Sequence, residues 1–329
     1  LRVVLSLPGV QSVGEASTGL NVRGGSASQN LILYNDAVVY NPAHLFGFFT
    51  AFNPDEIQSV EVQKGTFPVE YGGRLSSVID IKSKEGDKKK LVGTGGIGLL
   101  TGRFTLEGPI KSEKTSFLIG GRSSYSNWLL HKTPNESLNN SLASFYDLNL
   151  NVVHKVNVTN NFTLSTYWSS DKFRLNEDSL YTYTNSATSL KWKHIFSSQM
   201  SGSFVLTNSR YGYGVSSNKN PTEAFELSYR TNQYDLKADF DLTVSAHNLT
   251  LGFNSTVYDI RPGRLVPIGD SSIVSKDYIG QELAIENALF VGDNFEVNSR
   301  LSIYAGLRYS FFSALGPRKV VQYANDIPK

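Results

Sequence analysis

Residues 57–81 decide the fold of this chain, and they read IQSVEVQKGTFPVEYGGRLSSVIDI. Polar and apolar side chains alternate over residues 57–63, which predicts a β-strand. Lys64-Gly65 ends the alternation, and Pro68 has no backbone N–H to continue a hydrogen-bonded ladder. Residues 78–81 form a second short apolar run. The stretch therefore predicts two strands joined by a tight polar loop, with a Glu and an Arg that we expect to be buried.

This stretch resembles the plug domain of TonB-dependent outer-membrane transporters. The matching residues are Ile57, Val60, Glu61, Val62, Lys64, Gly65, Tyr71, Gly72, Arg74, Val78 and Ile81. A second motif of the family stands upstream, at residues 21–26 and 29–33. The amino-acid sequence of residues 40–49 and 72–77 is similar to that of the Bacteroidota branch of the family. The plug resemblance covers about the first quarter of the chain, and the remainder matches only in its pattern.

One turn departs from the family pattern. Where the family usually has Asp-Gly, this chain has Asn35-Asp36. Both residues tolerate the left-handed backbone conformation that such a turn needs. We therefore still expect a tight turn between two strands in residues 33–39.

The amino-acid composition excludes several classes of protein and of functional site. The chain has 329 residues, a net charge of +2 and no Cys. This balance of charge does not favour nucleic-acid binding, and the lack of Cys removes disulfides, zinc–thiolate sites and Cys nucleophiles. No apolar run approaches the ~18 residues of a membrane-spanning helix. The 17 Tyr and 19 Phe suit the aromatic girdles of a transmembrane β-barrel, although a soluble all-β protein would show the same alternation.

The chain divides into three predicted parts. Residues 1–84 are the plug domain, residues 85–90 are a charged, solvated hinge, and residues 91–329 are the N-terminal half of a transmembrane barrel. The fold class is thus mainly β, with a small α+β plug before antiparallel strands. Because Leu1 already lies inside a domain and no signal peptide is visible, we expect the sequence to be part of a longer precursor.

Eleven antiparallel strands are expected after the hinge. Strict alternation is clearest in residues 234–242, 249–257 and 301–311, and the predicted connections alternate between short turns and longer loops, as in outer-membrane barrels. Eleven strands are half of the about 22 in a plugged transporter. An open half-barrel would leave two bare edges in lipid, so we expect sequence outside this chain to supply the rest. The expected strands lie near residues 89–99, 102–108, 115–126, 145–156, 162–172, 186–196, 200–211, 225–243, 248–260, 280–297 and 300–312.

No constellation of catalytic or metal-binding residues stands out. The five His residues are scattered, with no pair at metal-ligand spacing. No Gly-x-Ser-x-Gly elbow is present. The glycine-rich residues 93–98 lack the helix of a dinucleotide-binding unit, and we interpret them as a barrel strand against which the plug packs closely. We expect no catalytic residues, no metal and no cofactor.

Four charged plug residues are candidates for locking the plug to the barrel. A charge buried inside a barrel must be paired. In the family, plug arginines pair with barrel acids, and the matching positions here are Arg23 and Arg74; an ordinary surface ion pair is the alternative. The four candidates are Arg23, Glu61, Glu70 and Arg74. Possible barrel partners are Glu107, Glu226 and Glu286.

Residues 40–52 form an aromatic-rich loop with two interpretations. It is either a plug apex that faces the ligand, or the small core of the plug, since aromatic residues in one loop usually pack together. In the first case Asn41 and His44 offer hydrogen bonds. The ligand-facing candidates are Tyr40, Asn41, His44, Phe46, Phe48 and Phe49.

The resemblance implies a TonB-dependent transporter or receptor of the outer membrane, and not an enzyme. Plug apices and extracellular loops would bind the ligand, and TonB would supply energy through a segment before the plug that is not in this sequence. The alternative is a transporter-like barrel that serves as a structural subunit of a larger outer-membrane complex. Expected partners are outer-membrane lipid, TonB, and a surface lipoprotein or larger complex. Glycan, peptide, chelated iron and cobalamin all remain open as ligands.

Overall fold

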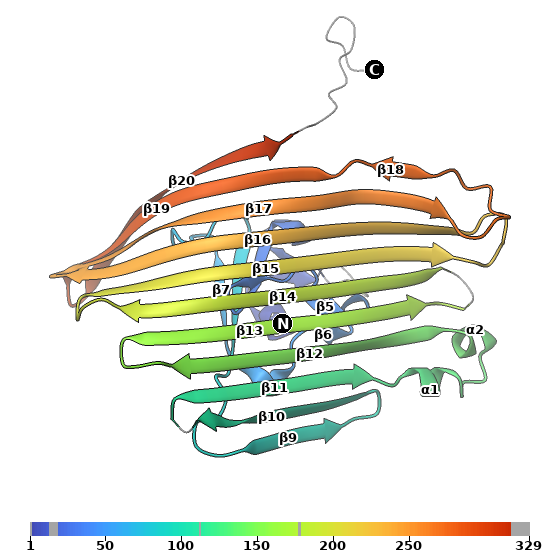
Figure 1. Cartoon of the computed structure of the whole chain (residues 1–329), viewed down its shortest axis with the longest axis horizontal. Coiled ribbons are helices and arrows are strands. Elements are labelled where there is room, and N and C mark those ends of the chain that lie inside the picture. Colours follow the sequence, from blue (N-terminus) through green and yellow to red (C-terminus); the bar gives the residue numbers. More distant parts are fainter. Residues whose placement is uncertain (1, 13–18, 112, 177–178, 317–329) are drawn as a thin grey trace, which may run out of the picture.

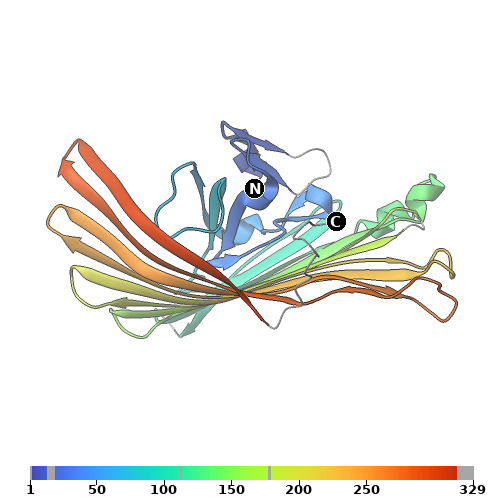
Figure 2. The ribbon, with the colours of Figure 1, turned by 90° about the horizontal axis from the view of Figure 1, so that it is seen from above.

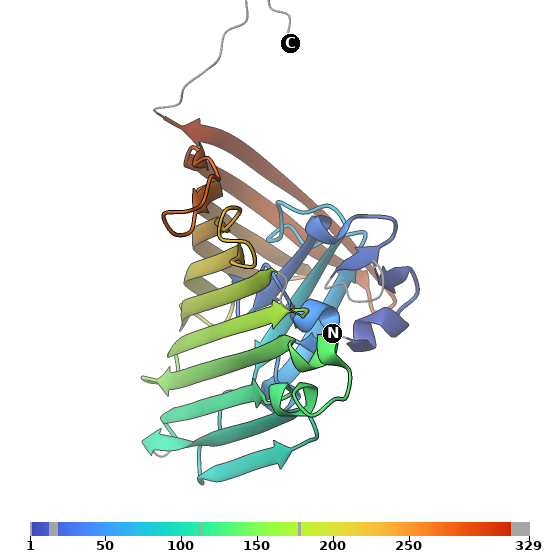
Figure 3. The ribbon, with the colours of Figure 1, turned by 90° about the vertical axis from the view of Figure 1, so that its right-hand side faces the viewer.

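The computed structural model describes residues 2–12, 19–111, 113–176 and 179–316 (Figure 1). Its main feature is one large curved antiparallel sheet. A small unit from the N-terminal part of the chain lies on the concave side of that sheet (Figures 2 and 3). We call this unit, which ends at Ser83, the plug, and the large sheet the wall. Among the described residues, no helix is long and apolar enough to cross a membrane.

The plug is built on a four-stranded sheet in the order β4-β3-β8-β7. Its strands are β3 (Asn30–Tyr34), β4 (Ala37–Val38), β7 (Ile57–Lys64) and β8 (Ser77–Ser83). β8 is almost wholly buried, and it pairs parallel with β3 and antiparallel with β7. The predicted strand–loop–strand of residues 57–81 is confirmed. Asn35 and Asp36 have φ of 47° and 74°, so the turn expected there is also present.

Smaller elements complete the plug. They are β1 (Val10–Ser12), β2 (Leu20–Val22), β5 (Ala43–His44), β6 (Phe49–Thr50) and four 3₁₀ helices at Arg2–Ser6, Ala27–Gln29, Leu45–Gly47 and Pro54–Glu56. The apolar core of the plug includes Tyr34, Phe52, Ile79 and Ile81. It continues into the wall, because Tyr167 belongs to the same buried cluster. The core of the small unit is therefore completed by the sheet on which it rests.

The wall contains the eleven long strands that the sequence predicts, joined in hairpin order within the described residues. One short strand, β18, was not predicted and pairs with β17. Two short helices, α1 (Asn127–Leu130) and α2 (Glu136–Asn139), lie between β11 and β12. The strands are β9 (Val92–Ile97), β10 (Thr101–Lys111), β11 (Thr115–Ser124), β12 (Leu142–Lys155), β13 (Asn160–Arg174), β14 (Leu180–Ile195), β15 (Met200–Ser217), β16 (Phe225–Val244), β17 (His247–Pro267), β18 (Asp277–Ile279), β19 (Glu282–Asn298) and β20 (Leu301–Leu315).

The wall has two chemically different faces. On β12, Asp147, Asn149 and Asn151 are buried on the inner face, which carries the plug. The alternate residues on the outer face are apolar and exposed, as Leu148 shows. Exposed leucines also lie on the outer face of the neighbouring strands: Leu164, Leu190, Leu206, Leu236, Leu251, Leu289 and Leu307. A polar inner face and an apolar outer face are the pattern of a transmembrane barrel strand.

Several strands are longer at the long-loop end than the sequence predicts. β14 begins at Leu180 where residue 186 was expected, β15 runs to Ser217 where a loop was expected from residue 211, and β17 runs to Pro267 where the strand was expected to end near residue 260. A strand needs only ~9–11 residues to cross a bilayer. The extensions, such as RPGRLVP at residues 261–267, lack the regular alternation of polar and apolar residues that made the rest of each strand recognisable.

The predicted domain limits stay a prediction, although the hinge can be located. The last plug strand ends at Ser83 and the first wall strand begins at Val92. Between them, Lys88 and Glu85 form an ion pair at 2.5 Å, and Ser116 donates a hydrogen bond to the Glu85 carbonyl. The end of the predicted barrel range, residues 317–329, lies outside the described residues.

Candidate functional site

A buried ion cluster attaches the plug to the inner face of the wall. His44 is the last residue of β5 and is fully buried. Its Nδ1 is 2.8 Å from Asp171 Oδ2, and its Nε2 is 3.2 Å from Asp147 Oδ2 in an ion contact that lacks hydrogen-bond alignment. Burial lowers the pKa of His44, but the two carboxylates outweigh burial and hold that pKa above its ordinary value. The two carboxylates therefore favour the charged imidazole more than water does.

Arg122 of β11 supplies the second cation of this cluster. Its Nε and Nη2 donate to Asp147 Oδ2 at 2.9 and 2.8 Å, and Nη2 also donates to the plug carbonyl of Thr50 at 2.6 Å. The His44 ring stacks on Phe145 with centroids 4.2 Å apart. With His44 charged, two cations balance two carboxylates, which is the condition under which buried charges are tolerated.

The backbone next to His44 is held in an uncommon conformation. Leu45 and Phe46 have φ of 47° and 56°, in the left-handed region that side chains other than glycine rarely adopt. The Leu45 N–H donates to Asp171 Oδ1 at 3.1 Å, so the same carboxylate that binds His44 also fixes this bend. Strain of this kind persists only where surrounding contacts enforce it.

Glu56 lies beside this cluster in a fully buried position. Asn53 Nδ2 donates to its Oε1 at 2.6 Å, while Oε2 has no partner among the described residues. Burial raises the pKa of Glu56 to about 7, against the opposing effect of the Asn53 hydrogen bond. The wall leaves room for this carboxyl only because residue 120 is a glycine: a Cβ there would come within 1.9 Å of Oε1.

A second ion cluster joins the plug to strand β14. Asp36, in the tight turn after β3, accepts from Lys191 of the wall at 2.9 Å and from Lys82 of the plug at 2.7 Å. Burial opposes the ionisation of Asp36, but the two ammonium groups outweigh burial and hold its pKa well below the ordinary value. A third contact, between Asp55 and Arg103 Nε at 2.6 Å, is more exposed.

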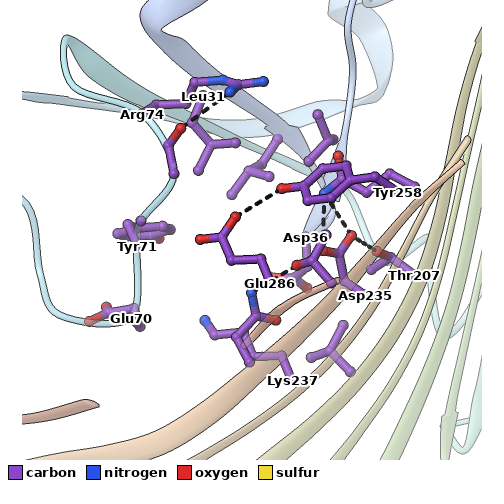
Figure 4. Close-up of a pocket in the computed structure, with 18 of the residues that line it drawn as sticks. Leu31, Asp36, Glu70, Tyr71, Arg74, Thr207, Asp235, Lys237, Tyr258 and Glu286 are labelled. Atoms are coloured by element: carbon purple, nitrogen blue, oxygen red, sulfur yellow. Dashed lines mark hydrogen bonds between the residues drawn. The ribbon is translucent and has the colours of Figure 1, made fainter. Parts of the chain in front are cut away.

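Two cavities separate the plug from β15–β20. The smaller, about 120 Å³, lies between plug residues such as Tyr71 and Arg74 and wall residues such as Asp235 and Glu286 (Figure 4). The larger, about 910 Å³, shares Arg74 and Glu286 and extends to Tyr40 and to residues 279–284. Tyrosine hydroxyls, a guanidinium and carboxylates therefore face both spaces. No group of three or more His, Asp or Glu side chains suited to a metal ion occurs in the part of the chain that the structure describes.

The four predicted locking residues occupy different surroundings. Arg74 and Glu70 are half-buried and line the smaller cavity, and Arg74 Nη1 donates to the Gly73 carbonyl at 3.2 Å. Burial raises the pKa of Glu70. Arg23 and Glu61 are exposed, and within the described ranges none of the four forms an ion pair with the wall. Of the expected acidic partners, Glu286 shares both cavities with Arg74, but their pairing and the locking role stay a prediction.

One arginine does join plug and wall, but it belongs to the wall and binds the plug backbone. Arg308 of the wall donates from Nη1 to the plug carbonyl of Val69 at 3.1 Å, and Tyr304 accepts from the Val69 N–H at 2.9 Å. A Cβ on Gly306 would collide with Val69 Cγ1, so the Val69 side chain packs directly on the backbone of the wall here.

The predicted ligand-facing loop mostly contacts the wall. The Tyr40 hydroxyl donates to Gln233 at 2.5 Å, and the Asn41 N–H donates to Asn185 at 3.3 Å. Phe46 lies edge-on to Phe173 with centroids 4.8 Å apart. The remaining residues differ: His44 and Phe49 lie against Phe145, and Phe48 is 61% exposed. Whether these residues face a ligand stays a prediction.

Sequence reasoning missed the acids and bases that hold the plug on the wall. They are Asp36, Arg122, Asp147, Asp171 and Lys191. Alternation on β12 does place Asp147 on the polar face, which is the one signal available. Its pairing with His44, about a hundred residues away in sequence, depends on how the plug sits on the wall.

Comparison with known proteins gives the family. The profile of the TonB-dependent receptor plug domain matches residues 2–78, and that of the TonB-dependent receptor-like β-barrel matches residues 114–325. No curated protein matches the chain. Many solved structures do match it.

Three of these structures illustrate the likeness in fold. The copper transporter OprC superposes with a TM-score of 0.75 at 11% identity, over 94% of this chain and 53% of its own. A ferric enterobactin receptor from Pseudomonas aeruginosa gives 0.71 at 15% identity, over 94% and 54%. The unliganded ferric citrate transporter FecA gives 0.70 at 12% identity, over 95% and 53%. The chain thus spans about half the length of these structures. Since the barrel profile alone covers more than half of its residues, the chain belongs to the family of TonB-dependent receptors, which are outer-membrane receptors and transporters.

Proposed function

We propose that this chain forms the plug and part of the barrel of a transporter that imports a ligand across the outer membrane with energy from TonB. The observation that carries the proposal is the way the plug is held. Its contacts with the inner face combine ion clusters around His44 and Asp36 with a shared apolar core. Ion pairs and hydrogen bonds are directional, so a pull that displaces them by a few ångströms weakens them steeply. Such an attachment closes the pore at rest and releases under force.

The ligand would bind above the plug, in the larger cavity. Tyr40, Arg74 and Glu286 face this space and can bind a ligand that carries both hydroxyl and charged groups. The solved structures named above are a copper transporter, a ferric enterobactin receptor and a ferric citrate transporter, so copper, ferric enterobactin and ferric citrate are the first ligands to test. The proposed ligand-facing residues of the loop are Tyr40 and Phe48, with Asn41, His44, Phe46 and Phe49 fixing the loop to the wall. The similarity to the Bacteroidota branch remains part of this proposal.

A disulfide across the plug–wall contact tests the proposal, because the chain has no Cys of its own. Val69→Cys with Gly306→Cys places two thiols at positions whose side chains would touch, because a Cβ on residue 306 would meet the Val69 side chain. Cells carrying full-length protein are assayed for uptake of iron-labelled siderophores, ferric citrate and copper. We expect uptake that requires this gene and TonB to stop on oxidation and to return on reduction. The single-cysteine variants are matched controls and should transport under both conditions.

The alternative is a transporter-like barrel that acts as a structural subunit of a larger outer-membrane complex, with a surface lipoprotein among the possible partners. The wall itself favours neither transport nor a structural role, but the tethered variant distinguishes the two functions. A scaffold would assemble equally well whether or not the plug is tethered. Gene-dependent uptake that continues in the oxidised double-cysteine protein would contradict transport by plug displacement.

A further inference from the structure

Four arginines gather on the outer face of the wall, away from the plug. Arg210 of β15, Arg230 of β16, and Arg261 and Arg264 of β17 line one groove of about 520 Å³. The strands that line it, β14–β17, lie in the middle of the sheet rather than at its edges (Figure 1). Its walls therefore come entirely from described residues of this chain.

The strand register shows which face these arginines occupy. Neighbouring residues of a strand point to opposite faces. Tyr211 contacts Tyr40 of the plug on the inner face, with ring centroids 6.3 Å apart. Arg210 precedes Tyr211 and therefore points outward. Arg230 stands opposite Gly212 and Arg261 in the ladder, which places it on the same face as Arg210.

A β-bulge brings the fourth arginine to the same side. Arg230 pairs with Arg261, but Ser228 pairs with Arg264, so β17 contains one extra residue at this point. In a regular strand, residues three positions apart lie on opposite faces. The extra residue of the bulge returns Arg264 to the same face as Arg261. The bulge lies at Pro262-Gly263, residue types that are common at such irregularities. Arg264 is thereby aimed into the groove beside Arg261.

The groove carries unbalanced positive charge. Within the described ranges none of the four arginines has an ion-pair partner, and Arg230 Nε is buried without a hydrogen bond. Glu226 is the one acid among the residues that line it, against four guanidinium groups. Gly212 and Gly214 form part of its floor, and a Cβ on either would meet the hydroxyl of Thr184 or Thr182 at 2.6 Å. The floor thus offers space and hydroxyl donors next to the cations.

The height of the groove on the wall is set by the apolar band. On the outer face of β17, Leu251, Phe253 and Val257 are followed by Asp259 and then Arg261. β17 begins at the short turn with His247, so the ~9–11 residues that cross a bilayer end just before Arg261. Long loops lie on the external side of such barrels. The arginines therefore stand at the level of the outer-leaflet headgroups.

We propose that this groove binds the phosphate groups of an outer-leaflet lipid headgroup. Guanidinium groups bind phosphate oxygens through paired parallel hydrogen bonds, and several of them around one groove suit a headgroup with more than one phosphate. The lipid source follows from position, because the groove opens directly above the apolar outer face along which acyl chains would lie. A bound lipid would be held to this side of the barrel.

Lipid titration of purified full-length protein in neutral detergent tests this site. The probes are a diphosphorylated lipid A, the same glycolipid after dephosphorylation, and inorganic phosphate. We expect the triple variant Arg230→Gln, Arg261→Gln, Arg264→Gln to lose at least about tenfold in affinity for the phosphorylated glycolipid. Triple replacement by Lys should restore part of that affinity, since charge is kept and the paired hydrogen bonds are lost.

The controls separate lipid binding from other causes. Arg300→Gln removes one arginine at the opposite, short-turn end and should bind as wild type. Heat-modifiable migration on gels reports that each variant barrel is folded. Equal affinity for the phosphorylated and dephosphorylated glycolipids would overturn the proposal. So would inorganic phosphate binding as tightly as the glycolipid, since the site would then be one for a free anion.

Discussion

At the scale of single residues, Glu56 has the most informative protonation state in the plug. Burial raises its pKa from 4.5 to about 7, so folded protein holds this proton over a range in which unfolded chain has lost it. Its contribution to stability is therefore present below pH 4.5 and is lost as pH rises toward 7. The carboxylate formed above that range would be buried next to Asp147, with Oε2 unpaired.

We predict that Glu56→Gln makes the full-length protein more stable at pH 8 than wild type, by on the order of 3 kcal/mol at most. The amide keeps the contact with Asn53 and cannot ionise. Below pH 4.5 the two proteins should unfold alike. Chemical unfolding of the barrel-inserted plug at several pH values measures the difference, and Asp55→Asn is a control at a more exposed neighbouring acid. A pH profile of Glu56→Gln parallel to that of wild type would contradict this assignment.

His44 shifts stability in the same direction with pH, for the opposite chemical reason. Its pKa is raised because the carboxylates favour the cation, so the stabilisation is present below its unfolded pKa and lost as pH rises through the folded value. Two neighbouring residues of the plug thus weaken its attachment when they lose their protons. The attachment of plug to wall should accordingly tighten in mildly acidic surroundings.

At the scale of elements, successive residues of each wall strand point alternately to the lipid and to the lumen. We predict that Leu236→Arg, on the outer face of β16, costs about 2–4 kcal/mol of folding free energy in lipid vesicles. Lys237→Arg is the matched control, since residue 237 points inward and pairs with Asp239. Urea titration of full-length barrel in vesicles gives both values. Equal tolerance at the two positions would indicate a sheet that is solvated on both faces.

Elements with a strong local signal are the ones that sequence predicts. The alternation of residues 234–242 and 249–257 lies inside β16 and β17, and Asn35-Asp36 forms its turn from the conformational freedom of two residues. β18 has three residues and no alternation to detect. The contacts of His44 and Asp36 were not predictable, because they depend on the placement of a plug strand against wall strands more than a hundred residues away.

At the scale of the whole molecule, the plug depends on the wall for its core. Tyr167 and Ala187 of the wall belong to the same apolar cluster as Tyr34 and Phe52 of the plug. We predict that residues 1–84 expressed alone have marginal stability, because the unit is small and its buried charges lose their partners. Circular dichroism melts and hydrogen exchange measure this. A cooperative melt at high temperature would contradict a plug that needs its barrel.

The last prediction concerns what keeps the pore closed. His44→Ala leaves Asp171 without its buried cation, and Arg122→Ala does the same to Asp147; stranding a buried charge costs about 3–5 kcal/mol. The loss falls on the contact between plug and wall, not on the strand ladders. We predict that the double variant raises the conductance of full-length barrels in planar bilayers while heat-modifiable migration on gels persists.

Arg23→Ala with Arg74→Ala is the informative comparison. Arg23 is exposed and Arg74 bonds a neighbouring carbonyl, so this pair should open the pore less than the His44 and Arg122 pair if the described contacts carry the attachment. If Arg23 and Arg74, the locking residues predicted from the family resemblance, hold the plug more strongly, the order reverses. The variant with Arg23→Ala and Arg74→Ala then conducts more. Closed channels in both double variants would mean that the apolar core and the Asp36 cluster hold the plug without either set. The rank order of the two conductances therefore assigns the lock to one set of residues.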